Sequence, residues 1–521
     1  MSSEVQTRSW QVRNTIEAIP GPARLPGPVS QVTGADPRRW LILAVVALAQ
    51  LMVVLDATIV NIALPSAQHA LHFSDIERQW VVTGYALAFG SLLLLGGRLT
   101  DLIGRKATFI AGLAGFAAAS AVGGAAGSFG ILVAARACQG AFGALLAPAA
   151  LSLLTTTFEG TKDRGKAFGI FGAIAGAGGA VGLLLGGLLT QYLTWRWCLY
   201  VNLVFAAVAC AGAVALLRRQ PAGGRPRLDL PGLATELGGM FCIVYGFSNA
   251  ASDGWHAAVT WGFLAAGAVM LTAFGYIEMR VRQPLLPLRL VLDRNRSAAY
   301  LSILVTGAGM FGIFLFLTYY LQETLGFSPV MAGVAFLPMV GAIIVSANLA
   351  NIVLLPRIGP RWLVAPGMLA AAAGLAWLTR IGVHSSYAAD VLLPLLLTSA
   401  GLGFVMSPSM NTGTAGVAPS DAGVASAMVN TGQQVGGSIG TSLLNTMAAS
   451  AAAGYLASHL SPRLMIGGRP APALVALAQV HSYTTAFWSA AGMFTAGSIL
   501  AALLFRRGAP TAQATEEAQA Q

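Results

Sequence analysis

Charge is scarce in this chain of 521 residues. Only 9% of the residues are Asp, Glu, Lys or Arg, whereas a soluble globular protein carries about 25%. Hydrophobic residues make up 56% of the chain, and its mean hydropathy is +0.71. This composition argues against a soluble enzyme, a disordered chain and a fibrous protein.

Cysteine and the motifs of enzymatic chemistry are scarce as well. The four cysteines form no CxxC pair, so neither a disulfide framework nor a zinc site is expected. The chain has no phosphate-binding G-x-x-x-x-G-K-[ST] loop and no HExxH. We therefore expect no enzymatic activity, no cofactor and no bound metal.

Long apolar runs are what the sequence has instead. A membrane-spanning helix needs about 20 mostly apolar residues, and these runs do not alternate as membrane β-strands do. Fourteen runs are predicted to be spans: 40–65, 78–97, 107–127, 130–154, 166–190, 197–217, 230–250, 257–278, 298–321, 329–350, 362–380, 390–411, 422–447 and 482–505. The predicted fold class is an all-α polytopic membrane protein.

The basic residues predict the orientation of these spans. With the N-terminus in the cytoplasm, 24 of the 30 Lys and Arg fall in inside segments, five fall outside, and Arg136 is left within a span. We expect a plasma-membrane protein with both termini cytoplasmic. The same distribution accounts for the net charge of +11 without nucleic acid, because a nucleic-acid site would gather the basic residues on one face of a domain.

An even number of spans with both termini inside suggests an internal duplication. The predicted organisation is a cytoplasmic tail (1–39), a six-helix bundle (40–217), two inserted spans with a cytoplasmic linker (218–297), a second six-helix bundle (298–506) with an external loop (451–481), and a second cytoplasmic tail (507–521).

Two charged residues lie within predicted spans, where a central Asp or Arg costs about 2.5–3.5 kcal/mol. Asp56 lies in span 1 and Arg136 in span 4. Burial disfavours the charged form of a carboxyl group and a nearby cation favours it, so we predict that Asp56 takes up and releases protons. Arg136 stays charged and is predicted to hold Asp56 or a substrate anion. The alternative is that both residues only join neighbouring helices.

Three glutamates are less informative. Glu236 lies early in span 7, where we expect a structural or interfacial role. Glu278 and Glu323 lie at span ends, where water is expected to be near.

The segment GRLTDLIGRK (97–106) joins spans 2 and 3 on the predicted inner side. Gly97 and Gly104 permit close packing and a tight turn. Asp101 and Arg105 have the spacing of a helical ion pair. Together with Lys106, these residues form a candidate inner gate.

Small, polar and aromatic residues mark two further candidate features. In span 5, Gly178, Gly182, Gly186 and Gly187 are predicted to form a close-packed seal, with ordinary helix packing as the alternative. A substrate pocket is predicted to be lined by Asn61, Tyr85, Phe89, Gln139, Tyr319, Tyr320 and Gln433.

Four motifs carry a family resemblance. GRLTDLIGRK (97–106) resembles the inner-loop signature G-x-L-x-D-x-x-G-R-K of the major facilitator superfamily, and RACQG (136–140) resembles its span-4 signature R-x-x-Q-G. LDATIVNIALP (55–65) and WRWCLYVNLVF (195–205) are similar to segments of the fourteen-span drug:proton antiporters, the EmrB/QacA-like group.

The resemblance implies the major facilitator fold, with two six-helix bundles and two inserted helices. It implies export of lipophilic or cationic drugs by alternating access, driven by proton entry. Asp56 and Arg136 then match the coupling residues, and Asp101 and Arg105 match the inner lock. Besides the small-molecule substrate, the expected partners are protons and membrane lipid, with no nucleic acid and no obligate protein partner.

One residue departs from the family pattern. The antiporter signature G-P-x-x-G-G would place proline at position 183, where this chain has Leu183, so a straighter helix is expected. Export of a lipid or an endogenous metabolite on the same fold therefore stays open. A non-transporting sensor or scaffold is a third hypothesis, against which Asp56 and Arg136 argue.

Overall fold

The structure is a computed structural model that describes residues 38–75, 77–158, 163–217, 229–281, 284–286, 288–415, 417, 422–459, 465–466 and 469–506. The described residues are almost entirely helical. The exception is one short antiparallel pair, β1 (Met465–Ile466) with β2 (Arg469–Pro470). The two predicted tails lie mostly outside the described residues.

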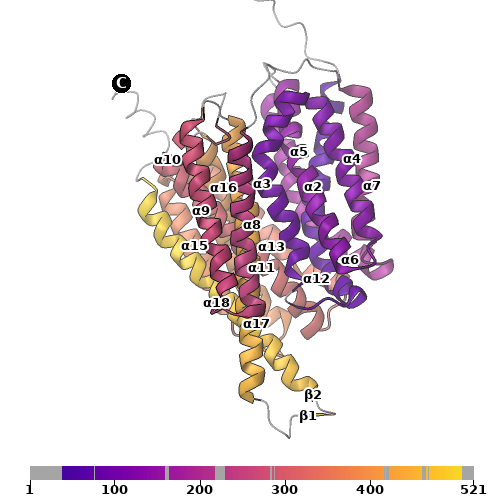
Figure 1. The fold of residues 1–521 in the computed structure, drawn as a ribbon, viewed down its shortest axis with the longest axis vertical. Coiled ribbons are helices and arrows are strands. Elements are labelled where there is room, and N and C mark those ends of the chain that lie inside the picture. The colour runs from indigo at the N-terminus through magenta and orange to yellow at the C-terminus, as the bar shows by residue number, and fades with distance from the viewer. Residues whose placement is uncertain are drawn as a thin grey trace, which may run out of the picture.

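The first six long helices pack into one bundle, drawn in indigo to magenta in Figure 1. They are α2 (Arg39–Leu71), α3 (Gln79–Ile103), α4 (Arg105–Gly124), α5 (Phe129–Thr157), α6 (Arg164–Tyr192) and α7 (Trp197–Leu216).

The second bundle follows residue 288 (Figure 1). Its elements are α10 (Leu288–Leu292), α11 (Arg294–Tyr319), η1 (Tyr320–Thr324), α12 (Pro329–Ala335), α13 (Leu337–Asn348), η2 (Leu349–Leu354), α14 (Leu355–Ile358), α15 (Arg361–Leu378), η3 (Tyr387–Val391), α16 (Leu392–Thr414), α17 (Ala422–His459) and α18 (Pro472–Leu504).

Between the bundles, α8 (Leu230–Asp253) and α9 (Ala258–Arg280) form a hairpin. The hairpin packs through α8 on α17 and, over a smaller area, on α3. Thr446 of α17 donates a hydrogen bond to the carbonyl of Phe247 in α8, 2.7 Å away. The inserted spans are therefore attached to both bundles.

Eleven helical stretches within the described residues are long and apolar enough to cross a membrane. This confirms the prediction of an all-helical, multi-pass membrane protein. Helices α3, α6 and α17, of 25, 29 and 38 residues, cover the other three predicted spans. The total of fourteen spans stays a prediction.

Three helix boundaries differ from the sequence prediction. Helix α2 continues through Pro65 to Leu71 instead of ending at the proline. Helices α17 and α18 extend to His459 and back to Pro472, so helix occupies much of the segment expected to be a loop. The alanine-rich sequence before His459 favours helix even though it is less apolar than a span.

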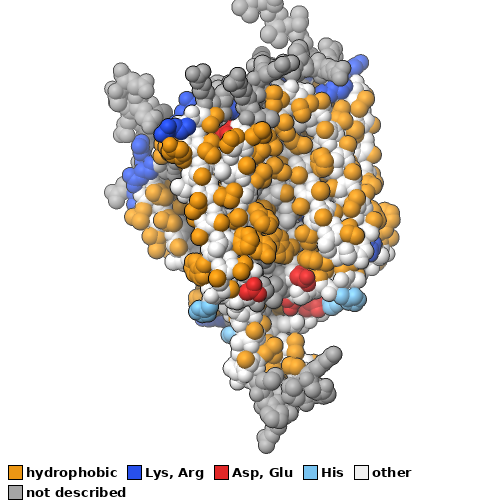
Figure 2. Space-filling model, viewed as in Figure 1, with side chains coloured by type: hydrophobic (Ala, Val, Ile, Leu, Met, Phe, Trp, Pro, Cys, Tyr) orange, Lys and Arg blue, Asp and Glu red, His pale blue; other side chains and the backbone are white. Residues whose placement is uncertain are grey.

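Charged side chains separate towards the two ends of the molecule. In Figure 2 most of the Lys and Arg in view lie at one end and the His lie at the other, while Asp and Glu are seen at both. Helix α2 runs between them, from Arg39 to His69 near its last residue. We call the end with Arg39 the basic end and the end with His69 the histidine end.

Small residues set the close contacts of α6. A Cβ atom at Gly178 would lie 3.0 Å from Val54, and one at Gly186 would lie 2.9 Å from the Ile59 carbonyl, both on α2. A Cβ at Gly187 would instead lie 2.6 Å from the Pro329 carbonyl of α12. Since lipid gives helices no hydrophobic reason to associate, such close packing is a main source of cohesion. Gly187 is therefore one of the residues through which α6 contacts the second bundle.

Candidate functional site

A buried ion pair lies inside the first bundle. Nη1 of Arg136 on α5 donates to Oδ2 of Asp56 on α2 at 2.6 Å. Asp56 is 0% exposed and Arg136 is 2% exposed. The two charged residues that the sequence placed in different spans are in direct contact, and each neutralises a charge that would be costly in the membrane.

Two amides hold the other carboxylate oxygen. Oδ1 of Asp56 accepts from Nδ2 of Asn202 at 2.7 Å and from Nε2 of Gln139 at 3.1 Å. Both amides also donate to the hydroxyl of Ser120. Asn202 and Ser120 were not predicted as site residues, although an isolated Asn in the apolar run 197–217 was a usable signal.

The guanidinium group has further partners on α3 and α5. Its Nε donates to the Val81 carbonyl at 3.2 Å, and Nη1 also reaches Oε1 of Gln139 at 3.0 Å. The Tyr85 ring lies against it, with its centroid 4.4 Å from Cζ, a cation–π distance. The buried hydroxyl of Tyr85 has no hydrogen-bond partner among the described residues. Oδ1 of Asn202 is unpaired among the described residues as well, so two unused polar atoms lie beside the ion pair.

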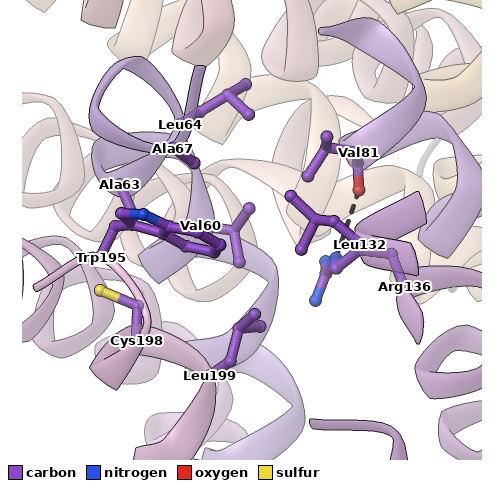
Figure 3. A pocket seen from close by; sticks show the side chains of 10 residues that line it. All are labelled: Val60, Ala63, Leu64, Ala67, Val81, Leu132, Arg136, Trp195, Cys198 and Leu199. Atoms are coloured by element: carbon purple, nitrogen blue, oxygen red, sulfur yellow. Dashed lines mark hydrogen bonds between the residues drawn. The ribbon is translucent and has the colours of Figure 1, made fainter. Parts of the chain in front are cut away.

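A narrow apolar cavity separates this site from the histidine end. It has a volume of about 10 Å³, close to the minimum for one water molecule. Figure 3 shows Arg136, bonded to the Val81 carbonyl, on one side and Trp195 with Cys198 on the other. The lining between them is apolar, including Val60 and Leu199. Such a cavity gives water too few partners to stay.

The residues predicted to line a substrate pocket lie in three places. Gln139 and Tyr85 contact the ion pair, and Phe89 lies next to Tyr85, with the two ring centroids 5.8 Å apart. Asn61 donates to the Ala57 carbonyl of its own helix. The others belong to the second bundle and are described next.

Tyr319, Tyr320 and Gln433 do not meet the first group. The hydroxyl of Tyr319 donates to Oε1 of Gln68 at the histidine end, and that of Tyr320 donates to the Gly382 carbonyl at 2.8 Å. Gln433 is half-buried on α17, where its carbonyl faces Gly307.

The candidate inner gate lies at the basic end. Gly104 has φ +94° and makes the turn between α3 and α4. Lys106 donates to the last carbonyls of α7, 2.9 Å from Val214 and 2.5 Å from Leu217, as expected for a cation at a helix C-terminus. Arg105 is also in contact with other residues.

The structure gives no contact for the other two gate residues, Asp101 and Gly97, among the side chains that it describes. The Asp101 side chain lies outside the described residues, so its pairing with Arg105 stays a prediction. A Cβ at Gly97 would meet nothing within 4 Å, whereas one at Gly96 would collide with the Ala144 carbonyl of α5. The expected close packing is therefore wrong for Gly97 and is provided by its neighbour.

The two bundles meet at the histidine end. Nε2 of Gln322 donates to the Ile62 carbonyl at 3.0 Å, and His69 Nε2 lies 3.1 Å from Glu323 Oε1. The Arg78 guanidinium, from the first bundle, lies over the Tyr319 ring at 4.2 Å. The structure therefore has the two bundles in contact at this end.

Comparisons with known proteins agree with this architecture. Residues 46–441 match the sequence pattern of the Major Facilitator Superfamily. The chain is 50% identical over 474 residues to the puromycin resistance protein pur8 of Streptomyces alboniger, which covers 90% of this chain and 92% of that protein. It is 39% identical over 422 residues to the cephamycin export protein CmcT of Amycolatopsis lactamdurans, with 79% and 86% covered.

A solved structure shares the fold. The inward-facing, occupied structure of a bacterial homologue of the human lysosomal transporter Spinster has a TM-score of 0.61. Its sequence identity is 17%, and the match covers 92% of this chain and 100% of that one.

Proposed function

We propose, from the premise that this chain belongs to the Major Facilitator Superfamily, that it is a proton-driven exporter of lipophilic or cationic drugs and antibiotics. The observation that carries the proposal is the ion pair of Asp56 and Arg136, buried in a chain whose relatives are antibiotic resistance and export proteins. A buried intramembrane acid beside a permanent cation is suited to exchange protons.

The proposed topology has fourteen spans, two bundles of six helices and two inserted helices, in the plasma membrane. The basic end then faces the cytoplasm, because cytoplasmic segments carry the excess of Lys and Arg. Both termini fall on that side, since α2 starts and α18 ends there. We place the chain in the fourteen-span drug:proton antiporter group, with Leu183 as a departure in α6.

In the proposed cycle, Asp56 binds a proton when water reaches it from outside. A neutral acid no longer holds Arg136, so the guanidinium group is freed to pull on α3 and α5 through Val81 and Gln139. The apolar cavity of Figure 3 supports this order of events, because it keeps water away while the bundles touch at the histidine end. Tyr85 and Phe89, beside the pair, are the proposed first contacts of the substrate.

The inner gate completes the proposal. Gly97, Asp101, Gly104, Arg105 and Lys106 lie where α3 turns into α4. We assign to them the closing of the basic end after substrate has entered. The glycines of α6 are assigned to the seal, with Gly178, Gly182 and Gly186 against α2 and Gly187 against α12.

The test is transport into proteoliposomes with an acidic lumen. Radiolabelled puromycin is a suitable first probe, because a relative sharing 50% of the residues is named for resistance to it. We expect gradient-driven accumulation by the wild type and none by Asp56→Asn. Glu323→Gln, which removes a carboxyl group at the histidine end, is the control and should accumulate normally.

Both variants must elute as folded protein, since Asp56→Asn leaves the Arg136 charge without its carboxylate. The neutral double variant Asp56→Asn/Arg136→Gln removes this concern. Accumulation by Asp56→Asn equal to that of the wild type would contradict the coupling assignment. Export of labelled lipid in place of drugs would favour the alternative substrate class.

A further inference from the structure

The inserted hairpin has three buried acids that the proposed export cycle does not use. Asp229 caps the start of α8, Glu236 follows in the second turn, and Glu278 lies in the last turn of α9. Their exposed fractions are 7%, 2% and 4%. The expectation that Glu278 lies near water is wrong, because residues 284–286 pack against it.

Each acid has one buried oxygen without a hydrogen-bond partner among the described residues. Oδ1 of Asp229 accepts from the Gly232 amide at 2.9 Å, but its Oδ2 is unpaired. Oε2 of Glu278 accepts from the Leu286 amide at 2.9 Å, but its Oε1 is unpaired. Oε2 of Glu236 is unpaired too. A carboxylate only accepts, whereas a protonated carboxyl group also donates. The missing groups are therefore donors, which bound protons would supply.

Two of these oxygens converge on Gly232. A Cβ at this glycine would collide with Asp229 Oδ2 and would lie 3.1 Å from Glu278 Oε1. Glycine leaves the space between the two carboxyl groups empty of side-chain atoms. One proton shared across this space would serve both oxygens. Glu236 follows Gly232 by four residues, about one turn of α8. It therefore lies on the same face of the helix as this space, and the three acids form one group.

Among the described residues, the positive charge around these acids is too small to balance them. On α3, half-buried Arg98 acts on Glu278 and donates to the Pro284 carbonyl at 2.6 Å. Arg280, at the end of α9, is exposed. The described residues of α17, which packs on α8, include no Lys, Arg, Asp or Glu, and its His459 is at the other end. Within the described part of the chain, Arg98 is the guanidinium group that acts on these acids, and three buried carboxylates beside it cannot all be ionised.

We propose that Asp229, Glu236 and Glu278 form a proton-binding site at the basic end of the inserted hairpin, separate from Asp56. The ligand is a proton and not a metal ion, because no group of three acidic, His or Cys residues in the described part of the chain has the geometry of a metal site. Carboxyl groups that face each other share protons as one unit.

The site is joined to both halves of the molecule. Residues 284–286 are held by Arg98 of the first bundle and by Glu278 of the hairpin, and they lead into α10 and α11 of the second bundle. Loss of the protons makes the acids repel one another and loosens this attachment. An effect of this loosening on transport rests on the proposed function, whereas the binding of protons to the three acids does not.

The test is infrared spectroscopy of the purified full-length protein in lipid nanodiscs, titrated with alkali. The carbonyl stretch of protonated carboxyl groups is measured in the Asp56→Asn background, so that Asp56 is silent. We expect an acid band that persists at neutral pH and disappears on further titration. The double variant Glu236→Gln/Glu278→Gln should lose this band, whereas Glu323→Gln should retain it. An unchanged band in the double variant would overturn the proposal.

A second measurement guards against misfolding. Gln has the shape and charge of a protonated Glu, so the double variant should melt at nearly the same temperature across the titration. The wild type should melt at a lower temperature as the pH rises. The melting temperature is also measured with Na⁺, K⁺ or choline as the salt cation. A melting temperature that depends on the Na⁺ or K⁺ concentration and not on pH would show a metal-cation site and overturn the proton assignment.

The two proposals fail separately. Gradient-driven transport by Asp56→Asn, with the acid band lost in the double variant, would refute proton coupling at Asp56 and leave this site intact. Transport that depends on Asp56, with no acid band at neutral pH, would refute the proton-binding site of the hairpin and leave proton coupling at Asp56 intact.

Discussion

At the scale of single residues, the ion pair in the first bundle depends on complete pairing. Asp56 accepts from Arg136, Gln139 and Asn202. A charge in a low-dielectric interior costs little only while such donors surround it. Removing one partner of the pair is therefore worse than removing both.

We expect Arg136→Ala to lower the stability of the protein by about 3–5 kcal/mol, because it leaves a buried carboxylate unpaired. The measurement is thermal melting in detergent by intrinsic fluorescence. The neutral pair Asp56→Asn/Arg136→Gln should recover most of the loss without recovering coupled transport. A melting temperature of Arg136→Ala equal to that of the wild type would show that the ion pair does not contribute to stability.

Substitutions of Tyr85 can distinguish a structural role of this side chain from a role in substrate binding. Its ring lies against Arg136, but its buried hydroxyl is unpaired among the described residues. An unsatisfied buried hydroxyl costs about 1–3 kcal/mol, so Tyr85→Phe should melt at the same temperature as the wild type or higher. Tyr85→Ala should melt lower, because it also removes the ring. A loss of drug transport in Tyr85→Phe, at unchanged stability, would identify the hydroxyl as a substrate contact.

At the scale of helices, close packing of α6 on α2 depends on the absence of side chains. A Cβ at Gly182 would collide with Thr58 and lie 3.0 Å from the Leu55 carbonyl. Neither backbone can move away without breaking the neighbouring contacts at Gly178 and Gly186. Gly178, Gly182 and Gly186 are therefore a structural feature of the first bundle. Helix α6 reaches α12 of the second bundle through other residues, among them Gly187, Leu183 and Gln191.

We expect Gly182→Ala to destabilise the protein by about 1–3 kcal/mol, as overpacking does. The matched control is Gly97→Ala, also within a helix, where a Cβ meets nothing within 4 Å. There the better helix propensity of Ala should raise stability by up to about 1 kcal/mol. Both are measured as shifts in melting temperature. Equal shifts for the two variants would show that packing on α2 does not limit stability.

The sequence predicted the positions of the helices better than it predicted which side chains of different helices contact one another. Apolar runs locate spans because length and composition are local properties, and RACQG marked Arg136 and Gln139 together. Asn202 was missed because it is 146 residues from Asp56 in the sequence, and a lone amide does not reveal which helix it faces. Helix ends such as His459 were missed because a helix can continue beyond the apolar run once neighbours support it.

At the scale of the whole molecule, the bundles touch in more than one place, because α3 packs on α17 and Thr431 of α17 donates to the Gly90 carbonyl of α3 at 3.1 Å. Side chains from both bundles meet at the histidine end through Gln322 with Ile62 and His69 with Glu323. Alternating access requires these contacts to break once in each cycle. The hydrogen-bonded pair of His69 and Glu323 is largely exposed on the histidine side, with 74% of the His69 side chain accessible, and exposed pairs contribute little to stability. It is therefore a contact that can open and close at small cost.

We expect a covalent link at this place to stop export. In His69→Cys/Glu323→Cys, a short thiol-specific bifunctional reagent should join the two bundles, and puromycin accumulation in proteoliposomes should stop. A reducible reagent should allow accumulation to return after reduction. Cys138 is exposed, so Cys138→Ser is included in every protein. Each single-cysteine variant, treated with the same reagent, should keep transporting, since it joins nothing. Unimpaired transport by the linked double variant would show that the bundles do not separate at the histidine end.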